Sequence, residues 1–143
     1  MRYVFVYGTL RRGEERDINR LRPQPCWIGW GSVSGTLYDL GSYPGIVLAE
    51  GHDSSGVQDA VKGEVYAVEF ELEQLLDRIE EVWPQSTGEY SKRDCVVRVS
   101  SPGAHPKPQR LSCLVYEVTP ARVVGKVLIP QGDWVQHRLA KDC

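Results

Sequence analysis

One stretch of this 143-residue sequence has the spacing of a strong amphipathic helix, and β-strand-like runs lie on both sides of it. The helix is predicted over Glu71–Val82, where apolar residues recur at i, i+3 and i+4 and define one buried face. The flanking runs are rich in β-branched and aromatic residues, which favour strands. These predicted strands are Arg2–Tyr7, Trp27–Leu40, Ile46–Leu48, Val61–Phe70, Arg93–Val99, Leu111–Val118 and Val123–Ile129. One good helix among many strands predicts an α+β fold with a mostly antiparallel sheet.

The length and composition predict a single globular domain over residues 1–143. The chain is 41% hydrophobic and 25% charged, and its formal net charge is −2. This charge gives no general electrostatic reason to bind nucleic acid or a membrane surface. No apolar run approaches the roughly 20 residues that span a bilayer, and no signal-type segment opens the sequence. We therefore expect a cytoplasmic protein with neither partner, and the oligomeric state stays open.

The cysteines and histidines do not have the spacing of a metal site. Cys26, Cys95, Cys113 and Cys143 are widely separated, with no C-x-x-C pair and no histidine at ligand spacing. Cys95 and Cys113 fall in predicted strands, so we expect them to be buried small hydrophobic residues. No metal and no cofactor are therefore expected.

Glycines end the first strand and shape the loop that follows it. Gly8 comes directly after the apolar run, and Gly13 follows five residues later. Such a turn can present successive backbone N–H groups as an anion-binding nest. A plain turn between a strand and a loop is the alternative, and spacing alone favours it. The motif is neither a phosphate loop nor a dinucleotide fingerprint.

Two further parts of the sequence have residue patterns that indicate a local structure. Arg11–Arg22 mixes arginines with acidic residues around a thin apolar stripe, which favours a short surface helix with a solvated charged face. A basic patch for an acidic partner is the alternative. Within Trp27–Leu40, glycines predict a bulge or a barrel corner. The residues of Asp39–Gly45 are typical of a turn.

Glu80 is the candidate for acid–base chemistry. At about 100° per helical residue, it lies at the edge of the apolar stripe, whereas Asp77 and Glu81 are expected to project away from it. Partial desolvation favours the neutral carboxyl, and the C-terminal end of a helix disfavours another negative charge. Both effects predict a raised pKa for Glu80. The alternative is a surface glutamate, one of five acidic residues in this helix.

Motifs along nearly the whole chain resemble those of the γ-glutamylcyclotransferase-like family, which includes AIG2-like and butirosin-pathway cyclotransferase proteins. In chain order these motifs are Tyr7–Gly13, Gly35–Leu40 with Tyr43–Gly45, Gly63–Tyr66, Leu76–Glu80 and Gly132–Trp134. The resemblance implies a small, closed or nearly closed β-barrel, mostly antiparallel, with helices packed outside. It also implies an intramolecular reaction, in which the α-amine of a γ-glutamyl compound attacks its own γ-carbonyl and releases 5-oxoproline and a free amine.

The resemblance also implies roles for particular residues. Glu80 ends a match to the family motif L-D-x-[LI]-E, whose glutamate is the catalytic acid/base. The backbone N–H groups that follow the first strand are suited to the substrate carboxylate or to the developing oxyanion. The implied substrate-binding residues are Tyr7, Gly8, Thr9, Leu10, Tyr43, Pro44, Gly45 and Tyr90. A non-catalytic ligand-binding or regulatory module of the same fold is the alternative.

The sequence departs from the family pattern at two places. Glu81 stands where a glycine is usual, and a second carboxylate there raises the pKa expected for Glu80. The family's Y-x-R is one residue longer here, so either Lys92 or Arg93 takes the place of the arginine that follows Tyr90. The resemblance leaves the particular γ-glutamyl substrate open.

Overall fold

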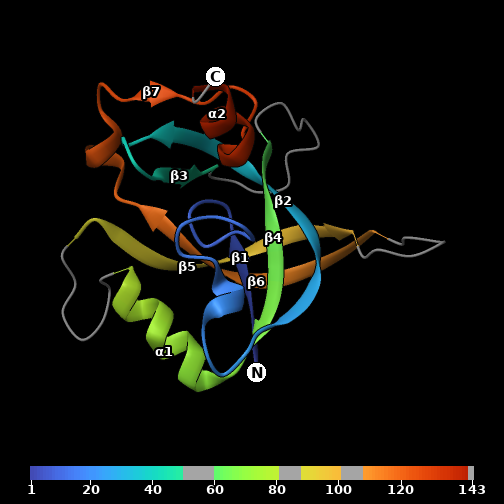
Figure 1. Cartoon of the computed structure of the whole chain (residues 1–143). Coiled ribbons are helices and arrows are strands. Elements are labelled where there is room, and N and C mark those ends of the chain that lie inside the picture. Colours follow the sequence, from blue (N-terminus) through green and yellow to red (C-terminus); the bar gives the residue numbers. More distant parts are fainter. Residues whose placement is uncertain (50–59, 81–87, 101–107, 142–143) are drawn as a thin grey trace.

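Figure 1 shows the computed structural model of the chain, which describes residues 1–49, 60–80, 88–100 and 108–141. The strands are β1 (Arg2–Val6), β2 (Cys26–Asp39), β3 (Pro44–Leu48), β4 (Ala60–Val68), β5 (Tyr90–Ser100), β6 (Pro108–Val118) and β7 (Val127–Leu128). The helices are α1 (Phe70–Ile79) and α2 (Trp134–Lys141), with short 3-10 helices at Ile18–Arg20 and Pro120–Val123. In the described part of the chain, neither α-helix is long and apolar enough to cross a membrane.

Five strands form a closed barrel in the order β2-β4-β1-β6-β5. The barrel closes where β5 returns to β2, from Trp30 opposite Ser100 to Ser32 opposite Arg98. The β1–β6 pair is parallel, and the other barrel pairs are antiparallel. Strands β3 and β7 extend the sheet beyond the barrel by pairing with β2. The predicted mostly antiparallel barrel is confirmed.

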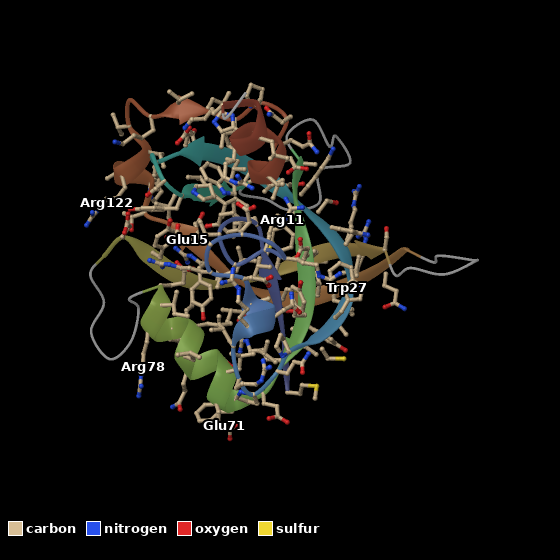
Figure 2. The ribbon with its side chains drawn as sticks, viewed as in Figure 1. Arg11, Glu15, Trp27, Glu71, Arg78 and Arg122 are labelled. Carbon is tan, nitrogen blue, oxygen red and sulfur yellow. The ribbon has the colours of Figure 1, made fainter. Side chains whose placement is uncertain are left out.

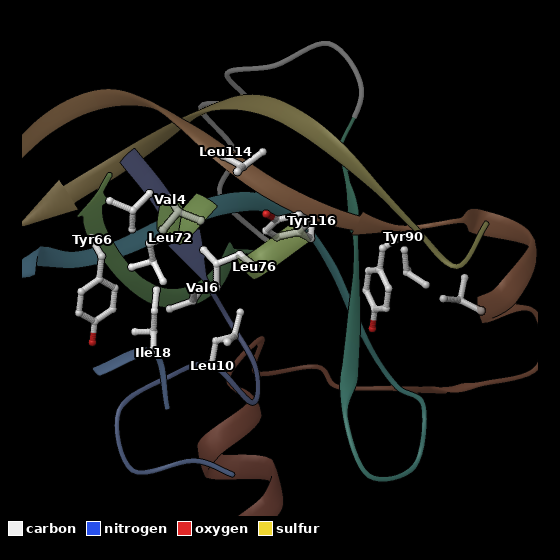
Figure 3. Close-up of a cluster of buried hydrophobic side chains, with 13 residues drawn as sticks. Val4, Val6, Leu10, Ile18, Tyr66, Leu72, Leu76, Tyr90, Leu114 and Tyr116 are labelled. Carbon is white, nitrogen blue, oxygen red and sulfur yellow. The ribbon is translucent and has the colours of Figure 1, made fainter. Parts of the chain in front are cut away.

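Alternation along the barrel strands produces two apolar layers, because successive side chains of a strand point to opposite faces. One layer fills the barrel, and it includes Phe5, Val65 and Val115. The other lies on the outer face and is covered by α1 and the 3-10 segment, as the close-up in Figure 3 shows. Its members include Val4, Val6, Ile18, Tyr66, Leu72, Leu76, Leu114 and Tyr116. The expected helix outside the sheet is therefore present.

The long strand β2 contains the predicted bulge. Its pairing with β4 shifts register between Trp27 and Gly29. A Cβ atom built on Gly29 would lie 2.3 Å from the carbonyl oxygen of Ser100, so only glycine allows β5 to approach so closely. The bulge thus lies at the seam where the barrel closes.

Several predicted boundaries are wrong. The fourth strand ends at Val68 rather than Phe70, because Phe70 already begins α1. The seventh strand covers only Val127–Leu128, since the segment before it forms a 3-10 helix. Helix α1 ends at Ile79 with Glu80 as its C-cap, and the predicted end at Val82 lies outside the described residues.

The expectation of a solvated surface helix over Arg11–Arg22 is also wrong. This segment folds back on the preceding loop and has only the single 3-10 helix. Arg11 and Glu14 are buried instead of solvated. Their charges are paired, Arg11 with two carboxylates and Glu14 with both the Nε and Nη2 atoms of Arg138 on α2, at 2.9 and 2.7 Å.

Helix α2 is also attached to the end of β2 through Asp39. The Asp39 carboxylate accepts hydrogen bonds from His137 Nε2 at 2.8 Å, Lys141 Nζ at 3.0 Å and the Gly41 amide at 2.8 Å. Burial alone would raise the pKa of Asp39, but these hydrogen bonds outweigh it and lower the pKa to about 2. The ionised carboxylate is therefore stabilised in the folded state.

We expect Asp39→Asn to destabilise the protein at pH 7 and to have progressively less effect between pH 4 and pH 2. A lowered folded-state pKa contributes stability above the unfolded value, near 3.8, and this contribution disappears as pH falls toward the folded value. Urea unfolding of wild type and variant across this range measures the difference. Asp94→Asn is the control, since the Asp94 side chain is exposed. A difference that stays constant from pH 7 to pH 2 would contradict the prediction.

Candidate functional site

A cavity of about 400 Å³ lies between the loop after β1, the β2–β3 turn, the end of α1 and the start of β5. Its described lining includes eight of the nine residues predicted for the site, with Gly45 as the exception. The eight are Tyr7, Gly8, Thr9, Leu10, Tyr43, Pro44, Glu80 and Tyr90. Gly45 follows Pro44 in β3, where an added Cβ would lie 2.8 Å from the Val118 side chain. It therefore faces β6.

The cavity also has polar lining residues that the sequence did not single out as individual site residues. These are Glu15, Arg16, Ser42, Arg78, Glu89 and Tyr116. Figure 2 shows Glu15 on the loop segment and Arg78 on α1. Arg78 immediately follows Asp77 in the predicted motif, and helical spacing alone did not separate it from the exposed residues of α1.

The loop Tyr7–Leu10 uses its carbonyl groups for its own structure. The carbonyl oxygens of Gly8, Thr9 and Leu10 accept hydrogen bonds from the amides of Arg11, Arg16 and Ile18, at 3.0, 2.9 and 2.9 Å. Within the described part of the chain, the amides of Gly8, Thr9 and Leu10 themselves donate to no protein group. These three successive N–H groups thus lie on the cavity-lining loop without a described protein acceptor.

Gly8 is required by a close approach to the β2–β3 turn. A Cβ atom at Gly8 would lie 2.6 Å from Cγ and 2.9 Å from Cδ of Pro44. Both residues line the cavity. The absence of a side chain at position 8 therefore sets how closely these two walls approach each other.

Arg11 holds the end of this loop through buried ion pairs. Its Nε lies 3.1 Å from Oε2 of Glu64 on β4, and its Nη1 lies 3.0 Å from Oδ1 of Asp133, which precedes α2. The backbone amide of Arg12 donates to Oε1 of Glu64 at 3.0 Å. The side chains of Arg11 and Glu64 are only 8% and 3% exposed. The loop is therefore fixed to the barrel on one side and to the α2 segment on the other.

Two buried tyrosines connect the walls of the cavity. The Tyr7 hydroxyl donates to the carbonyl oxygen of Tyr116 at 2.6 Å and accepts from the Ile46 amide at 3.3 Å. The Tyr90 hydroxyl donates to the carbonyl oxygen of Pro44 at 2.9 Å. Burial raises the pKa of both phenols, and the negative charge of Glu80 contributes to the rise in each case. Both remain neutral hydrogen-bond donors around neutral pH.

Glu80 lies at the C-terminal end of α1, half-buried, with its amide bonded to the Leu76 carbonyl oxygen at 2.9 Å. Its charge raises the pKa not only of Tyr7 and Tyr90 but also of Tyr116. Electrostatic coupling of this kind requires proximity. The carboxylate therefore shares the cavity with three phenol side chains.

A second carboxylate in the cavity belongs to Glu89. Its Oε2 accepts a hydrogen bond from the Tyr43 hydroxyl at 2.6 Å, which links the β2–β3 turn to the start of β5. Neither Lys92 nor Arg93 is among the described lining residues. Lys92 Nζ instead lies 2.7 Å from Glu73 on α1, and Arg93 Nε lies 3.0 Å from Glu117. The place of the family arginine thus stays unassigned.

Metal ligation has no candidate cluster in the described ranges, where no group of three or more His, Cys, Asp or Glu side chains could hold an ion. Both Cys95 and Cys113 were expected to be buried. Cys113 is buried, whereas Cys95 is only half-buried. The polar groups that line the cavity are carboxylates, phenols, guanidinium groups and backbone amides.

Comparison with known sequences identifies relatives. A family model described as gamma-glutamyl cyclotransferase, AIG2-like, matches residues 4–136. A curated protein of Vibrio cholerae is 43% identical over 79 residues, which cover 55% of this chain and 62% of that protein. A second, from Halalkalibacterium halodurans, is 32% identical over 104 residues, which cover 72% of this chain and 80% of that protein. Both have gamma-glutamylcyclotransferase as a provisional name. The match thus spans less than two thirds of the Vibrio protein.

Solved structures share the fold. An AIG2-like protein from Mus musculus has a TM-score of 0.67 and 23% identity, with 94% of this chain and 88% of that chain covered. The protein ytfP from Escherichia coli has a TM-score of 0.59 and 28% identity, with 95% and 98% covered. The closed barrel is therefore the fold of an AIG2-like protein. With the family match, the chain belongs to the AIG2-like gamma-glutamyl cyclotransferase family.

Proposed function

We propose that this chain is a γ-glutamyl cyclotransferase that converts a γ-glutamyl compound into 5-oxoproline and a free amine. The observation that supports the proposal best is the joint lining of one cavity by Glu80 and by the loop Gly8–Leu10. The first provides a proton acceptor. The second provides N–H donors for an anionic oxygen. A reaction within one substrate molecule needs little more than these two functions and a fixed geometry.

In the proposed reaction, Glu80 removes a proton from the substrate α-ammonium group. The freed amine nitrogen attacks the γ-carbonyl carbon, and the carbonyl electrons move onto its oxygen. The amides of Gly8, Thr9 and Leu10 bind this oxyanion or the substrate α-carboxylate. When the tetrahedral intermediate collapses, the bond from the γ-carbon to the leaving nitrogen breaks. Glu80 returns its proton to that nitrogen, then takes the second proton of the ring nitrogen and passes it to the released amine, so one carboxylate serves as both base and acid.

The tyrosines complete the proposed site. Tyr7 and Tyr90 are buried, neutral and already hydrogen-bonded to the backbone of neighbouring strands. We assign them to shaping the cavity rather than to proton transfer, because their raised pKa values make ionisation unfavourable. Pro44 and Tyr43 form the facing wall in the β2–β3 turn.

The test is release of 5-oxoproline from a panel of γ-glutamyl compounds, measured by liquid chromatography and mass spectrometry. The panel includes γ-glutamyl amino acids, γ-glutamyl-ε-lysine and γ-glutamyl polyamines. Time-dependent, stoichiometric appearance of 5-oxoproline and the matching amine supports the proposal. Saturable binding of a panel member without its turnover would instead favour the binding or regulatory module.

A substitution at Gly8 provides a further test of the loop. We expect Gly8→Ala to lower kcat/KM by about 10²-fold, the effect of losing one well-placed oxyanion donor, because the added methyl group would collide with the Pro44 ring. Gly125→Ala is the control, since it adds backbone strain (φ +77°) with nothing within 4 Å of an added Cβ at a residue outside the cavity lining. Steady-state kinetics on the best panel substrate measures both variants. An unchanged kcat/KM in Gly8→Ala contradicts the assigned role of the loop.

A further inference from the structure

Asp77 is a buried carboxylate on α1, three residues before Glu80, and only 7% of it is exposed. The prediction that it projects away from the apolar face is therefore wrong. Its Oδ1 accepts a hydrogen bond from the Tyr116 hydroxyl on β6 at 2.6 Å. Its Oδ2 lies 3.1 Å from Nζ of Lys92 on β5. Lys92 also binds Glu73, one turn earlier on α1, at 2.7 Å.

A carboxylate at this position is energetically expensive. Removing a charge from water costs several kcal/mol before its partners compensate for it, and well-packed apolar residues are often at least as stable as a buried ion pair. Asp77 also lies in the last turn of α1, where the helix dipole disfavours a negative charge. An apolar side chain would pack on the neighbouring cluster of Leu72 and Leu76 at lower cost.

The directional bonds of Asp77 have an effect that apolar contacts lack. An apolar face permits a helix to rotate or slide by small amounts, because its contacts are non-directional. Two bonds to fixed atoms on β5 and β6 define both the rotation and the height of α1 on the sheet. Tyr116 also accepts the Tyr7 hydroxyl through its own carbonyl oxygen. Tyr116 thus connects the last turn of α1, next to Glu80, to the cavity wall that bears Tyr7.

We propose that Asp77 is a positioning residue, which sets the location of Glu80 in the cavity through its bonds to Tyr116 and Lys92. The inference rests on the proposed function, in which Glu80 transfers the proton. Asp77 itself is not among the described residues that line the cavity. Its effect is therefore on the placement of Glu80 and not on direct binding of substrate.

The kinetic test compares Asp77→Asn and Tyr116→Phe with Glu73→Gln. Asp77→Asn removes the charge that faces Lys92, and Tyr116→Phe removes the hydroxyl that donates to Asp77, each with little change in volume. We expect kcat to fall about 10-fold or more in both variants while KM changes less than twofold. Glu73 is on the same helix as Asp77 and binds the same Lys92, so Glu73→Gln removes one bond of Lys92 but leaves Asp77 in place. Its kcat should stay at the wild-type value. Equal kcat in all three variants, measured well below their melting temperatures, overturns the proposal.

A second measurement separates this proposal from the proposed function. The side-chain carboxyl carbon of Glu80, labelled with 13C and assigned by its loss in Glu80→Gln, reports its surroundings by NMR whether or not the protein is active. We expect its chemical shift to change in Asp77→Asn and Tyr116→Phe but not in Glu73→Gln. An unchanged shift in the first two variants overturns the positioning role. Absence of 5-oxoproline release by wild type, with these shift changes present, would refute only the cyclotransferase proposal.

Discussion

Turnover in Glu80→Gln should fall by about 10²-fold or more, in line with the loss of a general base. Glutamine has the shape of glutamate and still forms hydrogen bonds, but it cannot accept a proton at neutral pH. Glu80 is the C-cap of α1 and not part of the apolar clusters, so the fold should stay intact. The expected result is therefore a large fall in kcat for 5-oxoproline release, with ligand affinity largely kept.

Three further carboxylates serve as controls for this substitution. Glu71→Gln, on the exposed first turn of the same helix, should leave the rate unchanged. Glu89→Gln removes another cavity carboxylate, next to β5, and tests whether any nearby charge suffices. Glu81→Gln alters the adjacent residue, which lies outside the described residues. Equal losses at positions 80 and 81 would mean that the two carboxylates act as a coupled pair. Full activity in Glu80→Gln would end the assignment.

Arg11→Met should lower the free energy of unfolding by about 3–5 kcal/mol, the cost of leaving buried charges without their partner. The side chain of methionine approximates the aliphatic part of arginine but cannot compensate Glu64 or Asp133, which lose a guanidinium at 3.1 and 3.0 Å. Urea denaturation followed by circular dichroism measures the change. Because Arg11 ends the loop that holds Gly8–Leu10, substrate affinity should fall as well.

The neighbouring Arg12→Met is the matched control for this stability prediction. The Arg12 guanidinium is on the surface, 5.0 Å from the ring centroid of Trp27. Exposed cation–π contacts contribute about 0.5–1 kcal/mol, so the loss should be correspondingly small. A double variant, Glu64→Gln with Asp133→Asn, in the Arg11→Met background should recover part of the stability. Similar losses for both single arginine variants would contradict the role of Arg11.

The apolar patterns of the sequence were sufficient to predict much of the secondary structure. The β-branched and aromatic run of β1 and the apolar spacing of α1 correctly predict a strand and a helix with one buried face, because each pattern is typical of one local structure. The glycines of β2 predict its bulge for a similar local reason. Closure of the barrel was implied only by the resemblance, since no local pattern specifies that β5 returns to β2.

Charged residues were the main source of error. Arg11, Glu14 and Asp77 are all buried, although a single sequence favours solvent exposure for each. Their compensating partners are distant in the chain: Glu64 and Asp133 for Arg11, Arg138 for Glu14, Lys92 and Tyr116 for Asp77. Burial of a charge depends on such partners, and spacing within one helix or loop contains no information about them. The lining residue Glu89 was not singled out for the same reason, because Tyr43 reaches it from the β2–β3 turn.

The position of β1 within the barrel has a consequence for synthesis of the protein. This first strand pairs with β4 and, in parallel, with β6 at Val4 and Leu114, while its loop is held by Asp133. Contacts between such distant parts of a chain form slowly, because a long loop must close first. During translation, the candidate site cannot assemble until the segment around Asp133 has left the ribosome. A nascent chain that is stalled before Leu114 should therefore leave the edge of β1 unpaired and open to chaperones or to other strands.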